Sequence, residues 1–176
     1  MPDGHGLQKL AAVIARRRVA AGFMLGALAF WFARPTPQTL AIGSLVAAAG
    51  EAVRIWAAGH LEKGREVTAS GPYALTRHPL YLGSALIAAG IAIASDRLVI
   101  AILVAAYMAI TIAAAIRTEE AQLTERFGPQ YPAYRAGRAT AVTRRFSAAR
   151  AIRNREYRAL LGLVAALALL AWKTAR

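Results

Sequence analysis

The amino-acid sequence predicts an all-α integral membrane protein, a bundle of about five transmembrane helices. Three observations support this fold class. Hydrophobic residues make up 57% of the 176 residues and the mean hydropathy is +0.40, whereas an ordinary soluble domain is about half apolar. The apolar residues gather in five runs, and the basic residues alternate between the segments that connect these runs. The length fits a single domain over residues 1–176.

The first apolar run, Val19–Ala33, is marginal in length, because crossing a bilayer takes about 20 residues. The cluster Arg16–Arg18 precedes this run, and its long side chains can snorkel to the interface and extend the span. A tight turn is expected at Arg34–Gln38, because two prolines in close succession cannot continue a helix. The second helix is then expected over Thr39–Ala58.

Glu51 and Arg54 interrupt this second run and lie three positions apart on one helix face. An intramembrane ion pair is a candidate functional site. The alternative is a structural pair that satisfies itself by contact along the helix. The structural interpretation is slightly favoured, because Arg54 can snorkel to the interface.

The third and fourth runs, Leu80–Ser95 and Leu98–Ile116, predict a helical hairpin, because only Asp96 and Arg97 separate them. Leu98–Ile116 is the safest of the five spans. The fifth run, Ala159–Trp172, is an extra hydrophobic helix at residues 159–172. It is short, so it either crosses the membrane or lies on it.

The basic residues predict the orientation of the bundle. Eighteen of the 22 Lys and Arg residues fall on one side of a five-span arrangement. Because cytosolic segments carry such an excess, we expect a multi-pass protein of a cytoplasmic or inner membrane with its N-terminus in the cytosol. This partition accounts for the net charge of +13 without a nucleic-acid partner. The chain has no cysteine, which excludes disulfides and thiolate metal sites, and no spacing of His, Asp and Glu indicates a metal site.

Two long connections, Gly59–Pro79 and Arg117–Arg158, lie on the predicted cytosolic side and contain nearly all the polar chemistry. Within the second connection, Arg144–Arg158 mixes arginines with apolar residues. Two interpretations of this segment are equally supported. One is an amphipathic helix on anionic headgroups, and the other is a basic loop that follows the positive-inside rule.

Ser70–Gly83 is the most informative segment of the chain. Pro79 suits the first position of the third helix, where its missing N–H costs nothing. The positive end of that helix suits an anionic group, such as the carboxylate of an amino-acid-like cofactor. Arg77 and His78 place donors around this point, and Gly83 would let a ligand approach the backbone. The alternative, given equal weight, is an ordinary basic turn at the membrane interface.

Arg117–Tyr134 is the second informative segment. Its adjacent carboxylates, Glu119 and Glu120, are costly to desolvate where a membrane helix leaves the bilayer, and one of them is well suited to bind ribose hydroxyls. The alternative is a solvated continuation of the fourth helix that ends at Phe127. Because the hairpin leaves and returns on one side, we expect His78 and Glu119 to be neighbours. Both segments would then form one cytosolic cofactor pocket.

Together the two segments resemble the isoprenylcysteine carboxyl methyltransferases and the related phospholipid methyltransferases. The matching patterns are Gly-Pro-Tyr-x-x-x-Arg-His-Pro-x-Tyr-x-Gly and, after the hairpin, Glu-Glu-x-x-Leu-x-x-x-Phe-Gly-x-x-Tyr-x-x-Tyr, within about Arg54–Arg145. The resemblance implies an S-adenosylmethionine-dependent methyltransferase with a lipid-like or lipidated acceptor at the cytosolic membrane face. It also implies a lipid-facing tunnel beside the cofactor pocket.

The same resemblance assigns roles to individual residues. It implies that the cofactor contacts Tyr73, His78, Pro79, Leu82 and Gly83. It implies that Glu119 or Glu120 holds the ribose and that Arg77 and Arg117 lie near the acceptor.

The chain departs from the eukaryotic members, which have more spans before the core, whereas this chain has two. It also adds the hydrophobic helix at 159–172. These parts are where acceptor specificity is expected to differ. The expected partners are an amphiphilic substrate and membrane lipids, with no obligate protein partner. A carboxylate, a phospholipid amine and a thiol all stay open as the methyl-accepting group.

Two other functions compete with methyl transfer. Sterol-reductase-like membrane enzymes that use NADPH have a similar Arg-His-Pro-x-Tyr element and hairpin. A non-enzymatic scaffold or small transporter would use the polar clusters only to anchor loops. Titration with S-adenosylmethionine, S-adenosylhomocysteine and NADPH separates the three.

Overall fold

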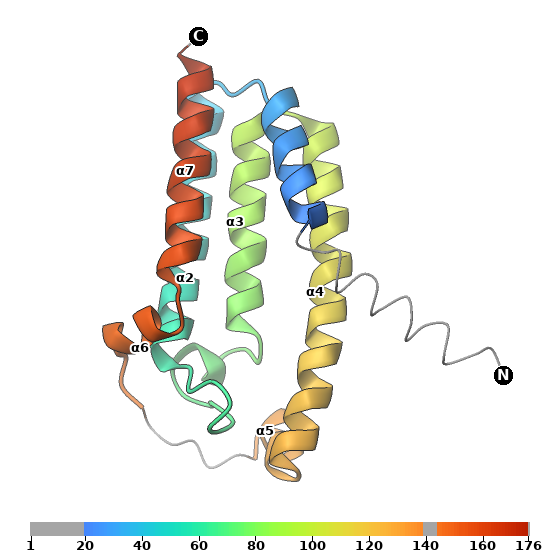
Figure 1. Cartoon of the computed structure of the whole chain (residues 1–176), viewed down its shortest axis with the longest axis vertical. Helices are drawn as coiled ribbons and strands as arrows, with labels where there is room; N and C mark the ends of the chain where they lie inside the picture. Colours follow the sequence, from blue (N-terminus) through green and yellow to red (C-terminus); the bar gives the residue numbers. More distant parts are fainter. Residues whose placement is uncertain (1–19, 139–143, 176) are drawn as a thin grey trace, which may run out of the picture.

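The computed structural model describes residues 20–138 and 144–175, in which helices alternate with short connections and no strand occurs (Figure 1). Three short helices gather at one end of the bundle, which we call the polar end: η1 (Gly71–Ala74), α5 (Gln130–Arg135) and α6 (Ala148–Arg153). Five apolar helices form the bundle itself: Ala20–Phe32, α2 (Pro37–His60), α3 (Pro79–Ser95), α4 (Leu98–Phe127) and α7 (Tyr157–Thr174).

All five predicted apolar runs form helices, which confirms the all-α fold class. α2, α4 and α7 are long and apolar enough to cross a membrane, while Ala20–Phe32 and α3 are shorter. The only buried residue of α4 is Ile100, whereas Leu98, Val99 and Ile102 are exposed. Such an apolar surface requires a bilayer around it, so the chain is a membrane protein. The five spans and the cytosolic N-terminus stay predictions, and Arg16–Arg18 lies outside the described residues.

Both predicted tight turns are present. Thr36 caps α2, because its hydroxyl accepts a hydrogen bond from a backbone N–H in the first turn of the helix. The backbone N–H of Arg34 donates to the carbonyl of Ser95 at 2.9 Å, so the two turns lie against each other. Asp96 ends α3 with a left-handed φ of 51°, and α4 returns beside α3 as the expected hairpin.

α2 and α3 pack backbone against backbone. A Cβ atom at Gly83 would lie 2.6 Å from the carbonyl oxygen of Gly50, and one at Gly90 would lie 2.5 Å from that of Gly43. Small residues at helix crossings allow membrane helices this close approach. The α2–α3 pair is therefore the framework from which the N-terminal end of α3 faces the polar end.

α7 lies beside α2, and an ion cluster joins them near the polar end. Arg54 donates from Nε to Glu156 at 2.6 Å and from a terminal nitrogen to Ser84 at 2.5 Å. Its Nε is 3.9 Å from Glu51, whose two buried carboxylate oxygens have no hydrogen-bond partner among the described residues. The i,i+3 ion pair favoured from the sequence is therefore present, but it does not satisfy itself, because the hydrogen bonds of Arg54 go to Ser84 and Glu156.

At the opposite end of the bundle, Lys173 fastens α7 to the first helix. Its Nζ donates to the carbonyl oxygens of Phe30 at 2.6 Å and Trp31 at 2.8 Å. The same ammonium group lies 5.2 Å from the centroid of the Phe30 ring. These carbonyls belong to the last turn of the first helix, where a cation is favourable.

The segment Arg144–Arg158, for which the sequence left an amphipathic helix and a basic loop open, is irregular at 144–147 and only partly helical. It contains the six-residue helix α6, and α7 begins at Tyr157. Three of its arginines pair with Glu62 and Glu66 of the connection between α2 and η1. These arginines thus form ion pairs with acidic side chains of the same chain.

Candidate active site

The candidate site begins at the N-terminal end of α3. Gly71 has a φ of 59° and starts η1, which returns the chain from α2 toward α3. His78 is the N-cap residue of α3, and Pro79 occupies the first turn, as predicted. α4 passes beside this point, because it continues beyond the apolar run to Phe127. The predicted continuation of the fourth helix is thus present. It places Glu119 and Glu120 beside the N-terminal end of α3.

Glu120 of α4 is surrounded by donors from two other segments, the start of α3 and α5. Its Oε1 lies 3.1 Å from a terminal nitrogen of Arg77 and 3.2 Å from Nε2 of His78. Its Oε2 lies 3.9 Å from a terminal nitrogen of Arg135. The hydroxyl of Tyr131 lies beside the same carboxylate without completing a hydrogen bond of normal geometry. Glu120 therefore ties α3, α4 and α5 together.

Glu119 has different surroundings. Its Oε2 is 3.9 Å from Nδ1 of His78, and its side chain is 45% exposed. The expected approach of His78 and Glu119 across the hairpin is confirmed. Because no donor lies at hydrogen-bond distance from Glu119 among the described residues, its oxygens remain accessible to a ligand.

A cavity of about 220 Å³ lies between α3, α4, α5 and the connection after α2. Tyr73 and Tyr131 line it, and both hydroxyl groups are buried with no hydrogen-bond partner among the described residues. Buried polar groups in native proteins nearly always have a partner, so these two hydroxyls have hydrogen-bonding capacity that a ligand or an ordered water could use. The cavity is also lined by Glu62, Glu66, Thr68, Arg77, His78, Pro79, Glu119 and Tyr134.

The phenol groups of the cavity are neutral at physiological pH. Burial, followed by the charge of Glu119, raises the pKa of Tyr73 well above its usual value. Burial and the neighbouring Glu120 carboxylate raise the pKa of Tyr131 to about 12. Both hydroxyls thus keep their protons and are available as hydrogen-bond donors.

A second cavity of about 510 Å³ adjoins the first one, and the two share Tyr73, Arg77 and Tyr134. The hydroxyl of Tyr134 donates to the carbonyl oxygen of Tyr73 at 2.7 Å, which joins α5 to η1 at the boundary. Arg135 lines the second cavity only. Together the two cavities reach the size range of small-molecule pockets, about 300–1,000 Å³.

The structure brings six of the nine predicted site residues together, namely Tyr73, Arg77, His78, Pro79, Glu119 and Glu120. The other three lie apart. Leu82 is 49% exposed on α3, and Arg117 is exposed on α4. Gly83 faces α2, whose backbone fills the space that the sequence assigned to a ligand.

Several residues that line the cavity were not predicted as site residues from the sequence. Tyr131 and Tyr134 belong to the matched Phe-Gly-x-x-Tyr-x-x-Tyr pattern, so the family resemblance could have identified them as site residues. Glu62 and Glu66 had no such signal. They reach the cavity only because the connection after α2 folds back against the N-terminal end of α3.

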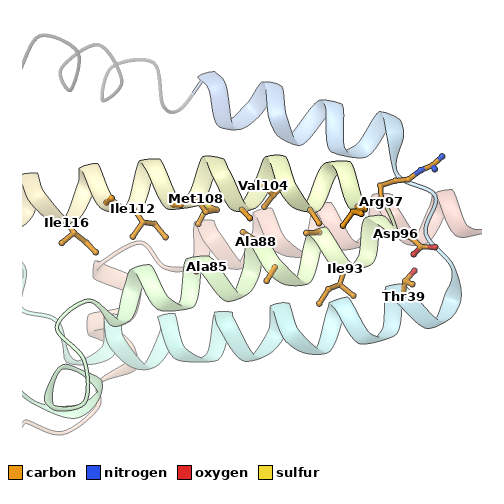
Figure 2. Close-up of a pocket in the computed structure, with 17 residues that line it drawn as sticks. Thr39, Ala85, Ala88, Ile93, Asp96, Arg97, Val104, Met108, Ile112 and Ile116 are labelled. Atoms are coloured by element: carbon orange, nitrogen blue, oxygen red, sulfur yellow. The ribbon is translucent and has the colours of Figure 1, made fainter. Parts of the chain in front are cut away.

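An apolar groove of about 950 Å³ runs along the α3–α4 hairpin (Figure 2). Ala85 and Ala88 of α3 and Val104, Met108 and Ile112 of α4 line it, together with other small and aliphatic residues. Its far end lies at the turn between the two helices. Its near end lies at Ile116, within one turn of Glu119, so the groove leads toward the polar cavity.

Comparison with known proteins gives three findings. The model of a family described as "Phospholipid methyltransferase" matches residues 17–130, more than half of the chain. The "Cobalt-zinc-cadmium resistance protein CzcN" of Cupriavidus metallidurans is 32% identical over 124 residues, which make up 66% of this chain and 57% of that protein. The chain thus spans little more than half the length of this relative. No solved structure matches the chain.

Proposed function

This chain belongs to the phospholipid methyltransferase family, and on that premise we propose that it transfers a methyl group from S-adenosylmethionine to a membrane amphiphile at the polar end of the bundle. The observation that carries the proposal is the cavity with two unpartnered tyrosine hydroxyls beside Glu119. Family membership supports methyl transfer. The identity of the donor and the class of acceptor are inferred from the site.

The polar groups of the cavity are complementary to the methyl donor. Tyr73 and Tyr131 offer hydrogen-bond donors, which suit the ring nitrogens and the carboxylate of that molecule. Glu119 offers acceptor oxygens, which suit the ribose hydroxyls. The N-terminal end of α3 lines the cavity at Pro79 and Leu80 and favours the carboxylate.

Of the two adjacent carboxylates, Glu119 is the better candidate for the ribose. Glu120 already accepts from Arg77 and His78, so binding ribose would require breaking these charge-assisted bonds. Glu119 loses no comparable contact when a ligand binds. Glu120 would then act as a positioning residue that holds His78 and Arg77 in place.

S-adenosylmethionine supplies a methyl group on a positively charged sulfur, and the protein must hold an acceptor atom in line with it at about 3 Å. Bound donor and acceptor would have to exclude water from the reaction, because Glu119 and Arg77 are half-exposed in the structure. Arg77, which lines both cavities, is placed to orient an anionic acceptor group. An amine acceptor must first lose a proton, for which His78 and Glu119, which both line the cavity, are candidate bases.

The apolar groove supports an acceptor with a hydrocarbon tail. Its lining is almost entirely alanine and aliphatic side chains, and it ends beside the polar cavity. An amphiphile would thus lie with its tail between α3 and α4 and its head near Glu119. A water-soluble acceptor would leave this groove without a role.

Calorimetric titration of the purified protein tests the methyl donor. We expect S-adenosylmethionine and S-adenosylhomocysteine to bind and NADPH not to bind. Tyr73→Phe should weaken binding about fivefold or more, because it removes one hydrogen-bond donor. Tyr157→Phe is the matched control, since Tyr157 is 45% exposed at the start of α7. Binding of NADPH alone would instead favour the reductase.

The acceptor class is tested with a labelled methyl donor. The protein is incubated with the donor and a native membrane extract, and the products are partitioned between water and organic solvent. Label is expected in the lipid fraction. Label confined to water-soluble products would contradict an amphiphilic acceptor, even if methyl transfer itself occurred.

A further inference from the structure

Residues 144–154, which we call the arginine arm, pack against the end of α2. The backbone N–H of Ser147 donates to the carbonyl of Gly59 at 3.1 Å. The amide nitrogen of Asn154 donates to the carbonyls of Ala58 and Leu61, each at 2.9 Å. These contacts satisfy carbonyls that the last turn of a helix leaves without a partner. The arm is therefore fixed to the point where the chain leaves α2.

From this position the arm presents three arginines to two glutamates. Glu62 accepts from Nε of Arg150 at 2.7 Å and from Arg153 at 3.0 Å. Arg144 donates from one terminal nitrogen to both oxygens of Glu66, each at 2.8 Å, and its other terminal nitrogen is 3.6 Å from Glu62. Charge-assisted bonds of this kind are stronger than neutral ones.

Glu62 and Glu66 belong to one side of the candidate cofactor cavity. Residues 61–68, which we call the cavity wall, contribute seven lining residues: Leu61, Glu62, Lys63, Gly64, Glu66, Val67 and Thr68. No helix runs through this wall, and few backbone hydrogen bonds are found within it, one of which joins Arg65 to Glu62 at 3.2 Å. Its shape is consequently set by side-chain contacts.

The arm lies outside the part of the chain that defines the family. The family model matches residues 17–130, and the arm begins fourteen positions later. The wall is thus inside the matched region, while the three arginines that pair with Glu62 and Glu66 come from outside it. The wall has its own cations, Lys63 and Arg65, but among the described residues neither forms an ion pair with Glu62 or Glu66.

We propose that the arginine arm holds the cavity wall in the shape that binds the methyl donor, with Arg144 and Arg150 as positioning residues acting through Glu66 and Glu62. This inference rests on the proposed function of the cavity. Residues beyond the family match would then contribute to the shape of the site. The arm is engaged at neutral pH, because a hydrogen bond from Arg150 keeps the pKa of Glu62 below its ordinary value.

The test compares Arg144→Gln and Arg150→Gln with Arg145→Gln. Arg145 lies in the same arm, and its side chain contacts neither glutamate, so it is a matched control for the loss of one charge. Each of the first two variants should raise the KM for S-adenosylmethionine and the Kd for S-adenosylhomocysteine about tenfold. The kcat at saturating donor should stay within twofold, and Arg145→Gln should leave all three values unchanged.

Rescue and backbone dynamics separate positioning from general stability. Arg144→Lys keeps the charge and should restore at least part of the affinity lost in Arg144→Gln. Hydrogen exchange without ligand should become faster in residues 61–68 of both Gln variants, with the bundle helices unchanged. Glu66→Gln offers a milder change if an arginine variant does not fold.

The two hypotheses fail in different ways. If the wild-type protein binds no S-adenosylhomocysteine, the proposed function fails, and exchange in the wall still decides the role of the arm. If the wild-type protein binds and the Gln variants bind equally well, the arm does not position the wall. Unchanged exchange in residues 61–68 would overturn the inference in either case.

Discussion

Glu119 and Glu120 are neighbours in sequence on α4, yet their side chains have different surroundings. Glu120 accepts from Arg77 and His78, and its side chain is 21% exposed. Glu119 is 45% exposed, and its one ion-pair partner among the described residues is His78, at 3.9 Å. The pair therefore divides into one carboxylate that holds neighbouring side chains and one that is available to the proposed ligand.

Substitution of these two residues should have separable effects. Glu119→Gln should weaken S-adenosylhomocysteine binding and leave thermal stability unchanged. Glu120→Gln should weaken binding and also destabilise the fold by about 1.5–3 kcal/mol, because Arg77 and His78 lose a charged acceptor. Calorimetric titration and thermal unfolding in one detergent measure both quantities. Glu125→Gln, an exposed residue of the same helix, is the control. Equal losses of stability in both variants would contradict this division.

Glu62 predicts a pH dependence of stability. Its folded-state pKa is lower than the ordinary value of 4.5, first because of the hydrogen bond from Arg150. The unfolded chain therefore takes up a proton at higher pH than the folded chain does. The stability that Glu62 contributes is fully present above the ordinary pKa and is lost as the pH falls through the folded pKa.

Thermal unfolding between about pH 3 and pH 7 tests this dependence. The melting temperature of the wild-type protein should fall on acidification below pH 4.5. Glu62→Gln should have a lower melting temperature at pH 7 and a flatter profile in acid. Identical profiles for the two proteins would show that the ion pairs of Glu62 add nothing to stability.

At the scale of secondary-structure elements, the sequence was most informative where the relevant contact is local. Pro79 has a fixed φ and no N–H, so it predicts the start of α3 correctly. Asp96 and Arg97 leave room only for a turn, so the hairpin and the approach of His78 to Glu119 follow from chain geometry.

Contacts between distant elements could not be predicted in this way. Gly83 permits close approach of either a ligand or a helix, and only the packed structure identifies α2 as the neighbour. Likewise, Arg144 and Glu66 are 78 positions apart, and nothing in either local pattern specifies the other as its partner. The excess of arginine in the arm could be read from the sequence, but the glutamates that pair with these arginines could not.

The α3–α4 hairpin supports a prediction about the acceptor. Ala109 lies in the apolar groove, and a large side chain there should obstruct a hydrocarbon tail. Ala109→Trp should raise the KM for a long-chain acceptor several-fold, with little change in the affinity for S-adenosylhomocysteine. An acceptor with a short tail should be affected less, because it does not reach Ala109.

The matched control is Ala106→Trp, at an exposed position of α4 that does not line the groove. It should leave both KM values unchanged. If the two tryptophan variants behave alike with every acceptor, the groove does not hold the tail, and the acceptor enters the site by another route.

At the scale of the whole molecule, the bundle is asymmetric. The polar end holds η1, α5, α6, both polar cavities and most of the ion pairs, while the opposite end has the two tight turns and Lys173 (Figure 1). This arrangement agrees with the partition of basic residues in the sequence, which assigns the polar end to the cytosol.

Reporter fusions test that orientation. Fusions after Lys63 and Arg138 should report the cytosol, and fusions after Arg34 and Arg97 should report the other side. The reason is the excess of Lys and Arg in the segments around the first pair. If Lys63 and Arg138 report opposite sides, the two halves of the candidate site cannot meet in one compartment.

The arginine arm also has a consequence for biosynthesis. Glu66 leaves the ribosome 78 residues before Arg144, so α2, α3 and α4 are translated before the arm that pairs with Glu62 and Glu66. Glu62 and Glu66 lack these arginine partners until the arm has been translated. Assembly of this enzyme would accordingly end with the segment that lies outside its family's common core. A nascent chain stalled before residue 144 would hold every residue proposed to contact the methyl donor and yet bind it poorly.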